Sequence, residues 1–293
     1  MISYNPKDWI RFIFGFHRAD TFRKLFPLLL VIGAYSWGIA WLELEYLHLS
    51  ETSHVRNLTL LHNLLGFAIS MLLVFRTNTA YDRWWEGRRQ WGGLVNASRN
   101  LSVKLAAILP ESAVADRRFF CQLIPQYAHT LRMHLQSEEI RWELDEIPHP
   151  EFSRIDASKH PPSQIAALLL NRLVALQAKG VITAEHLLLL NTDITTFLDV
   201  CGACERIKNT PIPFSYSGFI KKFIFIYILT LPIGFVFNLG YLVIPVVVFV
   251  FYVLASLEVI AEEIEDPFGK DSNDLPMEKM SQTIQRSVKD VLG

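Results

Sequence analysis

The sequence predicts an all-α membrane protein, with four transmembrane helices and a long helical domain outside the bilayer. The mean hydropathy of +0.24 is high for a soluble protein, and the apolar residues concentrate at both ends of the chain and leave a polar middle. The charge-free windows near the two ends approach the roughly 20 residues that a helix needs to cross a bilayer. No segment alternates apolar and polar residues for long enough to indicate a sheet.

The composition and the N-terminal residues exclude several classes of protein. The 293 residues carry a formal net charge of -1, so no strongly basic surface suggests a nucleic-acid partner. Three cysteines are too few for a disulfide framework in a chain of this length. Arg23 and Lys24 precede an apolar run that has no small-residue cleavage site after it, so we expect this run to remain as a membrane anchor.

The first two predicted transmembrane helices are charge-free windows. The first covers residues 25–42, between a basic pair and Glu43. The second covers residues 57–75, about 19 residues and close to the length of a spanning helix. Basic and aromatic residues follow the second window directly, as is typical of a membrane interface: Arg76, Arg83, Trp84, Trp85, Arg88 and Arg89.

The third and fourth predicted helices share one long window. Residues 223–257 carry no charge, and as one straight helix they would be roughly 52 Å long at about 1.5 Å per residue. A bilayer has a hydrocarbon core of about 30 Å. The Asn238-Leu239-Gly240 tripeptide near the middle is a turn signal, so we expect two short helices that meet there.

Lysine and arginine residues near the ends of the windows predict the orientation. Basic clusters lie in the first 24 residues, after the second window and before the third. The loop between the first two windows holds only Arg56, and the turn at Asn238 holds no basic residue. Because cytoplasmic loops carry the excess of basic residues, we expect both termini and the polar middle in the cytoplasm.

The polar middle reads as helices, because Leu94, Leu101 and Leu105 recur at helical spacing and Pro110 interrupts the pattern. The expected organisation has five segments. They are a cytosolic N-terminal segment (1–24), the first two transmembrane helices (25–85), a cytosolic helical domain (86–218), the last two transmembrane helices (219–257) and an acidic cytosolic C-terminal segment (258–293).

An apolar stripe marks the second window. Phe67, Met71 and Phe75 recur four residues apart, which places three bulky side chains on one face of a helix. His62 and Asn63 lie near the start of the same window. Polar groups inside a bilayer usually face a bundle interior or a water-filled path, so Asn63 is a candidate pore-entrance residue, although a position at the interface explains it equally well.

Three carboxylates close the fourth window. Glu258, Glu262 and Glu265 stack on one helix face and repel one another. An arginine cluster, a cation or open water must offset this repulsion. They are candidates for a cation-attracting vestibule or a subunit contact, and a solvated helix end is the alternative.

Two further motifs have weak chemical signals. Cys201 and Cys204 form a Cys-x-x-Cys pair, but the βαβ context of a redox pair is absent and a closed zinc site needs four ligands. His129 and His134 lie five apart with no glutamate between them, unlike a zinc-protease motif. We therefore predict packing roles for the cysteines, no metal site and no catalytic residue.

Several blocks of sequence together carry a family resemblance. They are VFRTNTAYDR at 74–83, CERI at 204–207, TPIPF at 210–214, AEEIEDPFG at 261–269 and NDLP at 273–276. In this order and spacing they resemble the bestrophin channel family in its bacterial branch, over nearly the whole chain.

The resemblance implies a homopentamer around a central pore, in a bacterial inner membrane, with lipids and monovalent ions as partners and no cofactor. It implies a narrow neck of three apolar residues on the second span, which fall on Phe67, Met71 and Phe75. A second constriction, the cytosolic aperture, falls on His186, or on Leu187 if the alignment slips by one residue. Five imidazoles at this aperture would make the exit charge-dependent. The acidic calcium-binding run of eukaryotic members is interrupted at Lys270 and its neighbours, so we expect no calcium site.

The resulting hypothesis is passive ion conduction through an apolar neck that gates by dewetting. The acidic cluster that begins at Glu258 and the resemblance to the bacterial branch favour monovalent cations such as sodium. Chloride conduction, as in eukaryotic relatives, is the main competing hypothesis. Two more hypotheses remain: a membrane-bound thiol or metal enzyme built on Cys201 and Cys204, and a membrane scaffold that conducts no ions.

Overall fold

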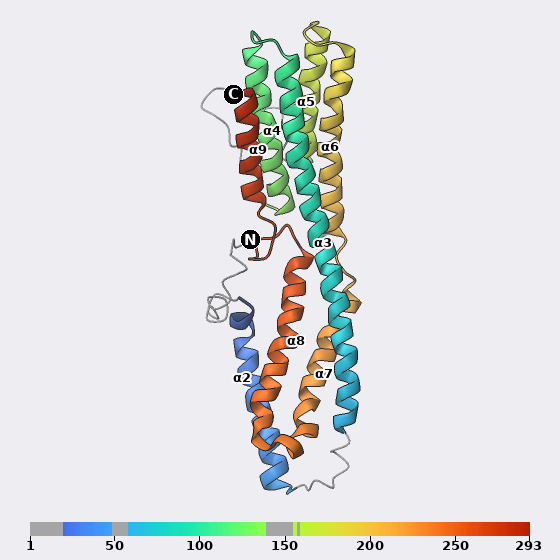
Figure 1. Cartoon of the computed structure of the whole chain (residues 1–293), viewed down its shortest axis with the longest axis vertical. Helices are drawn as coiled ribbons and strands as arrows, with labels where there is room; N and C mark the ends of the chain where they lie inside the picture. The colour runs from blue at the N-terminus through green and yellow to red at the C-terminus, as the bar shows by residue number, and fades with distance from the viewer. Residues whose placement is uncertain (1–19, 49–57, 139–154, 157–158) are drawn as a thin grey trace. The chain divides into compact units, whose positions relative to one another are not determined.

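The computed structural model describes residues 20–48, 58–138, 155–156 and 159–293 (Figure 1). The chain divides into two compact units. We call the first the membrane unit, which takes in the described residues up to Asp82 and residues 211–265. The second, the bundle unit, comprises the described residues of 83–210 and 266–293. The described residues form helices, turns and loops, and no strand occurs among them.

The membrane unit contains the helices whose composition fits a bilayer. They are α2 (Asp20–Trp41) with a π-helical turn η2 (Leu42–Tyr46), the first part of α3 (Leu58–Ile108), α7 (Phe214–Leu239), a short 3-10 turn η5 (Gly240–Leu242) and α8 (Val243–Glu265). Helix α2 packs against α7 and α8, and α7 packs against α8. Ile69 and Leu73 of α3, Ile228 of α7 and Val247 of α8 are buried in the common apolar core.

The turn predicted between the third and fourth helices is confirmed. Helix α7 ends at Leu239, and Gly240 follows with φ +52, a backbone conformation that glycine adopts without steric cost. The two helices, of 26 and 23 residues, together extend beyond both ends of the charge-free window, because the charged residues around Lys221 and Glu262 are also helical.

Helix α3 joins the second predicted span to the helical pattern of Leu94, Leu101 and Leu105 in one continuous helix. The expected span ended at Phe75, but the helix continues to Ile108 over 51 residues. No proline occurs between Leu58 and Ile108, and Pro110 follows the last helical residue closely. Since proline is the strongest helix breaker, its absence lets the helix continue past the charged residues that end the apolar window.

The bundle unit is built from the last part of α3, α4 (Val114–Leu135), α5 (Pro161–Ala178), α6 (Ala184–Asn209) and α9 (Met277–Leu292). Helix α4 packs against α5 and α9, and α5 packs against α6. Trp91, Leu101, Phe120, Tyr127 and Phe197 are fully buried in its core. This core is a second hydrophobic cluster, formed by the segment that the sequence describes as polar.

Four helical stretches are long and apolar enough to cross a membrane by length and composition: Thr21–Tyr46, Thr59–Ile108, Ala184–Asn209 and Phe214–Glu265. The last contains both α7 and α8. The third is α6, which buries one apolar face, including Leu190 and Phe197, in the core of the bundle unit. The apolar residues of α6 are therefore explained by packing within the bundle unit. The membrane-spanning helices are α2, α3, α7 and α8.

Candidate functional site

The apolar stripe on α3 lies on the face that the chain leaves uncovered. Phe67, Met71 and Phe75 are 74%, 49% and 52% exposed. Ile69 and Leu73, on the other side of the helix, are each 1% exposed and pack in the core of the membrane unit. The stripe is therefore free to line a path or to contact another molecule.

Polar residues lie on the same exposed side of α3, on both sides of the stripe. Asn63 is exposed four residues before Phe67, and Asp82 is exposed seven residues after Phe75. Seven residues are close to two full turns, so Asp82 continues the stripe about 10.5 Å further along the helix axis. Asp82 was not among the site residues predicted from the sequence, although its spacing of seven residues from Phe75 already placed it on the same helix face.

His62 has a different environment from Asn63. Its side chain is 2% exposed, and its Nε2 lies 3.0 Å from Thr230 Oγ1 on α7. Its ring lies 5.6 Å from that of Tyr227, also on α7. His62 thus belongs to the contact between α3 and α7, which is one of the two environments expected for a polar group in a bilayer.

An arginine offsets two of the three carboxylates at the end of α8. Arg76 of α3 is 1% exposed, and its Nη2 donates to Glu265 Oε2 at 2.7 Å. Its Nε lies 3.6 Å from Glu258 Oε1, and Glu258 is 4% exposed. The other oxygen of Glu265 accepts a hydrogen bond from the Ile212 backbone N–H at 2.7 Å. These charges hold α3 and α8 together within one chain.

The neighbouring acidic residues also have basic partners. Lys221 of α7 contacts both oxygens of Glu262 at 3.0 Å, and Lys24 of α2 donates to Glu263 at 2.8 Å. The Glu262 side chain keeps 58% exposure. A role at a vestibule or subunit contact stays a prediction for all three carboxylates. It suits Glu262 best, because burial removes Glu258 from water.

His186, in the bundle unit, occupies the first turn of α6. Its backbone N–H donates to Thr183 Oγ1 at 3.3 Å, and its Nδ1 accepts from the Thr183 backbone N–H at 3.5 Å, a reciprocal capping box. Its side chain is half-buried, and Leu187 packs against the core of the unit. The aperture role of His186 stays a prediction, and the structure adds a local role as a helix cap.

His134, for which the sequence predicted no site, belongs to a cluster that the fold assembles. His134 at the end of α4, His160 just before α5 and Glu205 on α6 converge in the bundle unit, and Glu205 Oε1 lies 2.7 Å from the Nε2 atom of each histidine. Burial alone would raise the pKa of Glu205, but the hydrogen bonds and charges of the two histidines outweigh it and lower that pKa. His129 lies apart from this cluster.

The Cys-x-x-Cys motif is a packing feature. Cys201 and Cys204 form no disulfide and are buried on α6 in the core of the bundle unit. Burial, reinforced by the charge of Glu205, raises the pKa of Cys201 to about 12 and also raises that of Cys204. A thiol must lose its proton to act as a nucleophile, so this environment opposes thiol chemistry.

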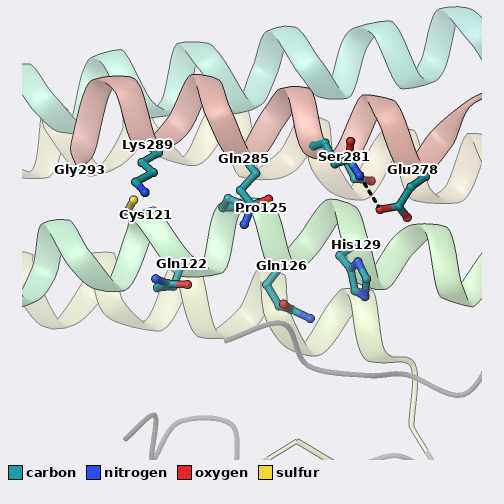
Figure 2. A pocket seen from close by; sticks show the side chains of 11 residues that line it. Cys121, Gln122, Pro125, Gln126, His129, Glu278, Ser281, Gln285, Lys289 and Gly293 are labelled. Atoms are coloured by element: carbon teal, nitrogen blue, oxygen red, sulfur yellow. Dashed lines mark hydrogen bonds between the residues drawn. The ribbon is translucent and has the colours of Figure 1, made fainter. Parts of the chain in front are cut away.

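A small polar cleft lies between α4 and α9 in the bundle unit (Figure 2). Cys121, Gln126 and His129 on α4 line it together with residues of α9, among them Glu278 and Lys289. Arg132 Nε lies 3.0 Å from Glu278 Oε2 and ties the two helices together at this cleft. The lining mixes amide, thiol and charged groups and has no pattern of a catalytic set.

Comparison with known proteins settles the family. A family model described as Bacterial/Fungal Bestrophin protein matches residues 1–290. The chain belongs to the bestrophin family. Among solved structures, a bacterial bestrophin homologue from Klebsiella pneumoniae superposes with a TM-score of 0.80 at 31% identity, over 90% of this chain and 97% of that one. The prediction of an all-α membrane protein with four transmembrane helices is confirmed by this likeness.

Named bestrophin relatives are channels. A protein from Ralstonia nicotianae is 33% identical over 97% of this chain and 92% of its own length. A protein from Synechocystis is 36% identical over 78% of this chain and 75% of its own length. Both are named voltage-dependent anion channel-forming proteins. Bestrophins are ion channels and not enzymes, so this chain is an ion channel and a bacterial membrane protein. The hypothesis of a membrane-bound thiol or metal enzyme is therefore wrong.

Proposed function

We propose that the chain forms a homopentameric channel for monovalent ions, with Phe67, Met71 and Phe75 as its neck. The observation that carries this proposal is the exposure of these three side chains on one face of α3, opposite a buried face. In a ring of subunits, such a face meets itself across the axis and makes an apolar constriction. A constriction of this kind closes by losing its water and opens when it widens.

Asp82 favours cations. Five copies would form a ring of carboxylates two helical turns beyond the neck, on the same face of α3. A ring of acidic side chains concentrates cations and repels anions at the mouth of a pore. Glu258 and Glu265, which the sequence suggested for this role, are poorly suited to it, because both carboxylates lie against the Arg76 guanidinium and little of either side chain is exposed.

Anion conduction is the second candidate. The relatives from Ralstonia nicotianae and Synechocystis are named as anion channel-forming proteins. In the bundle unit, Arg88 and Arg89 line an open hollow on α3 with Trp85. Arginines in a wide part of a pathway would draw anions, and the ion pair of Arg89 with Glu86 offsets part of that charge.

The proposed location is the inner membrane of a bacterium, with both termini in the cytoplasm. This orientation follows from the basic residues that flank the spanning helices. Several of the N-terminal ones, such as Lys7 and Arg11, lie outside the described residues. Membrane lipids cover the outward faces of α2, α7 and α8 in this arrangement.

The test of selectivity is the reversal potential of purified full-length protein in planar bilayers under a sodium chloride gradient. Cation selectivity predicts a shift toward the sodium potential, and Asp82→Asn should move the reversal potential toward zero. Asp290→Asn makes the same chemical change on an exposed position of α9 and should leave it unchanged. A reversal near the chloride potential would keep the pore and favour the anion candidate.

The test of assembly is the mass of the detergent-solubilised particle. A pentamer predicts five times the 33.7 kDa of the chain plus bound detergent. No current from the protein, even with Phe67, Met71 and Phe75 all changed to alanine, would overturn the pore assignment.

A further inference from the structure

The structure brings together three side chains with metal-ligand chemistry that the conduction pathway does not use. His134, His160 and Glu205 each offer one ligand atom, and these atoms lie within 4.8 Å of one another. They come from the end of α4, the residue before α5 and the last turns of α6, all within the bundle unit. We propose that these three residues bind one divalent transition-metal ion of the zinc type, which joins the three helices.

The approach of two imidazoles to one oxygen supports this proposal. Both Nε2 atoms lie 2.7 Å from the same atom, Glu205 Oε1, and the two rings are 4.7 Å apart at an interplanar angle of 79°. With Zn–N and Zn–O bonds of about 2.0–2.2 Å, tetrahedral ligand atoms lie about 3.3 Å apart. Each nitrogen therefore needs to move about 0.6 Å away from the oxygen to admit the ion, which side-chain rotation supplies.

The second nitrogen of His160 has the partner that a metal-bound histidine requires. Its Nδ1 lies 2.7 Å from Ser163 Oγ and accepts from the Ser163 backbone N–H at 3.3 Å when the ring caps α5. Binding of the ion selects the other tautomer, in which Nδ1–H donates to the Ser163 hydroxyl and Nε2 presents its lone pair to the ion. Such hydrogen bonds from the far nitrogen fix the tautomer and the ring orientation of metal ligands.

The three ligands sit on well-anchored backbone. His160 is the N-cap of α5 and precedes Pro161 and Pro162, which restrict the backbone there. Gln136, which caps α4 just after His134, donates to the Gly269 carbonyl at 2.9 Å. Because the backbone already holds these side chains in place, less conformational entropy is lost when the ion binds.

The ligand set selects the class of metal. Two imidazoles and one carboxylate match the three protein ligands of many zinc sites, with water completing the tetrahedron. Calcium prefers six to eight oxygen ligands, so this nitrogen-rich set disfavours it. Because the site joins three helices of the bundle, the expected role is to stabilise that unit.

The test is metal binding by tag-free, full-length protein in detergent, stripped with a chelator and then titrated with Zn²⁺. We expect one equivalent of tightly bound Zn²⁺ per chain and a rise in Tm on loading. Co²⁺ in place of Zn²⁺ should give the intense visible absorption of a four-coordinate ion. His134→Gln and Glu205→Gln should each lose the bound equivalent, the Tm rise and the Co²⁺ spectrum.

The control is His129→Gln, on the same helix and five residues from His134, which should bind Zn²⁺ like the unchanged protein. Each variant is compared with its own metal-free Tm, so a loss of stability is not mistaken for a loss of metal. The proposal is overturned if the unchanged protein takes up no stoichiometric Zn²⁺, or if His134→Gln binds it equally well. None of these readouts depends on ion conduction, so the result is independent of the proposed function.

Discussion

Arg76 and Glu265, 189 positions apart in the sequence, form a partly buried ion pair that joins α3 to α8 in the membrane unit. Glu258 approaches the same guanidinium from one side, and the Ile212 backbone holds the far oxygen of Glu265. The second transmembrane helix, which carries the apolar stripe, is therefore joined by an ion pair to the end of the fourth. This tie explains why an arginine stands immediately after Phe75.

Replacing Arg76 with methionine should destabilise the protein strongly. The change leaves the buried Glu258 and the partly buried Glu265 without their cation. Removal of one partner of a fully buried pair costs about 3–5 kcal/mol of the free energy of unfolding, so we expect a loss toward the lower end of that range. Thermal unfolding of the solubilised protein measures the effect. Glu262→Gln breaks only the exposed pair with Lys221 and should cost less than about 1 kcal/mol. Equal Tm values for the two variants would contradict this account.

Alanine at Phe67, Met71 and Phe75 together should raise single-channel conductance or open probability several-fold. Smaller side chains widen the constriction, and a wider apolar pore keeps its water. Recordings in planar bilayers measure the change. Val74→Ala removes apolar volume from an exposed neighbour that lies one residue off the stripe and should have a much smaller effect. A triple variant with unchanged conductance would place the gate elsewhere.

Changing His186 to alanine should alter conduction if this residue forms the aperture. The matched variant is Thr183→Ala, which removes the same capping box without changing the side chain at position 186. Loss of an N-cap costs about 1 kcal/mol of stability, so both variants should show a modest fall in Tm. Only His186→Ala should change conductance or ion preference. If both variants conduct like the unchanged protein, His186 is a cap and not an aperture residue.

The thiols of Cys201 and Cys204 should resist modification in the folded protein. The pKa of Cys201 is raised to about 12 by burial, so this thiol stays protonated at pH 8, and the half-buried Cys121 should react first. Counting reactive thiols over time with a coloured disulfide reagent measures this order. The double variant Cys201→Ala, Cys204→Ala should keep its ion conduction. Loss of conduction in an intact assembly would show that the pair does more than pack.

Features that depend on local sequence were predictable. The charge-free windows marked the spanning helices, because the bilayer sets their length and excludes charge. The turn at Gly240 and the stripe through Phe67 follow from backbone freedom and helical period, which each act over a few residues. The spacing of the stripe marks it without any likeness to a family.

The extent of α3 and the partners of the charged residues were not predictable in this way. The charges after Phe75 marked the end of the apolar window, and the sequence did not show that the helix continues through them or that Arg76 pairs with Glu265 from a distant part of the chain. The repulsion among the carboxylates at the end of α8 had to be offset by a partner. The sequence allowed an arginine cluster, a cation or water, and did not decide among them.

By itself, therefore, the sequence determined the membrane helices and the apolar stripe, since hydrophobicity and helical period are properties of neighbouring residues. The tertiary structure decided which charges are neutralised and which side chains converge. His134, His160 and Glu205 are separated by 26 and 45 positions, and no spacing rule joins them. Only the packing of α4, α5 and α6 brings their ligand atoms together, because contacts between helices depend on the whole fold.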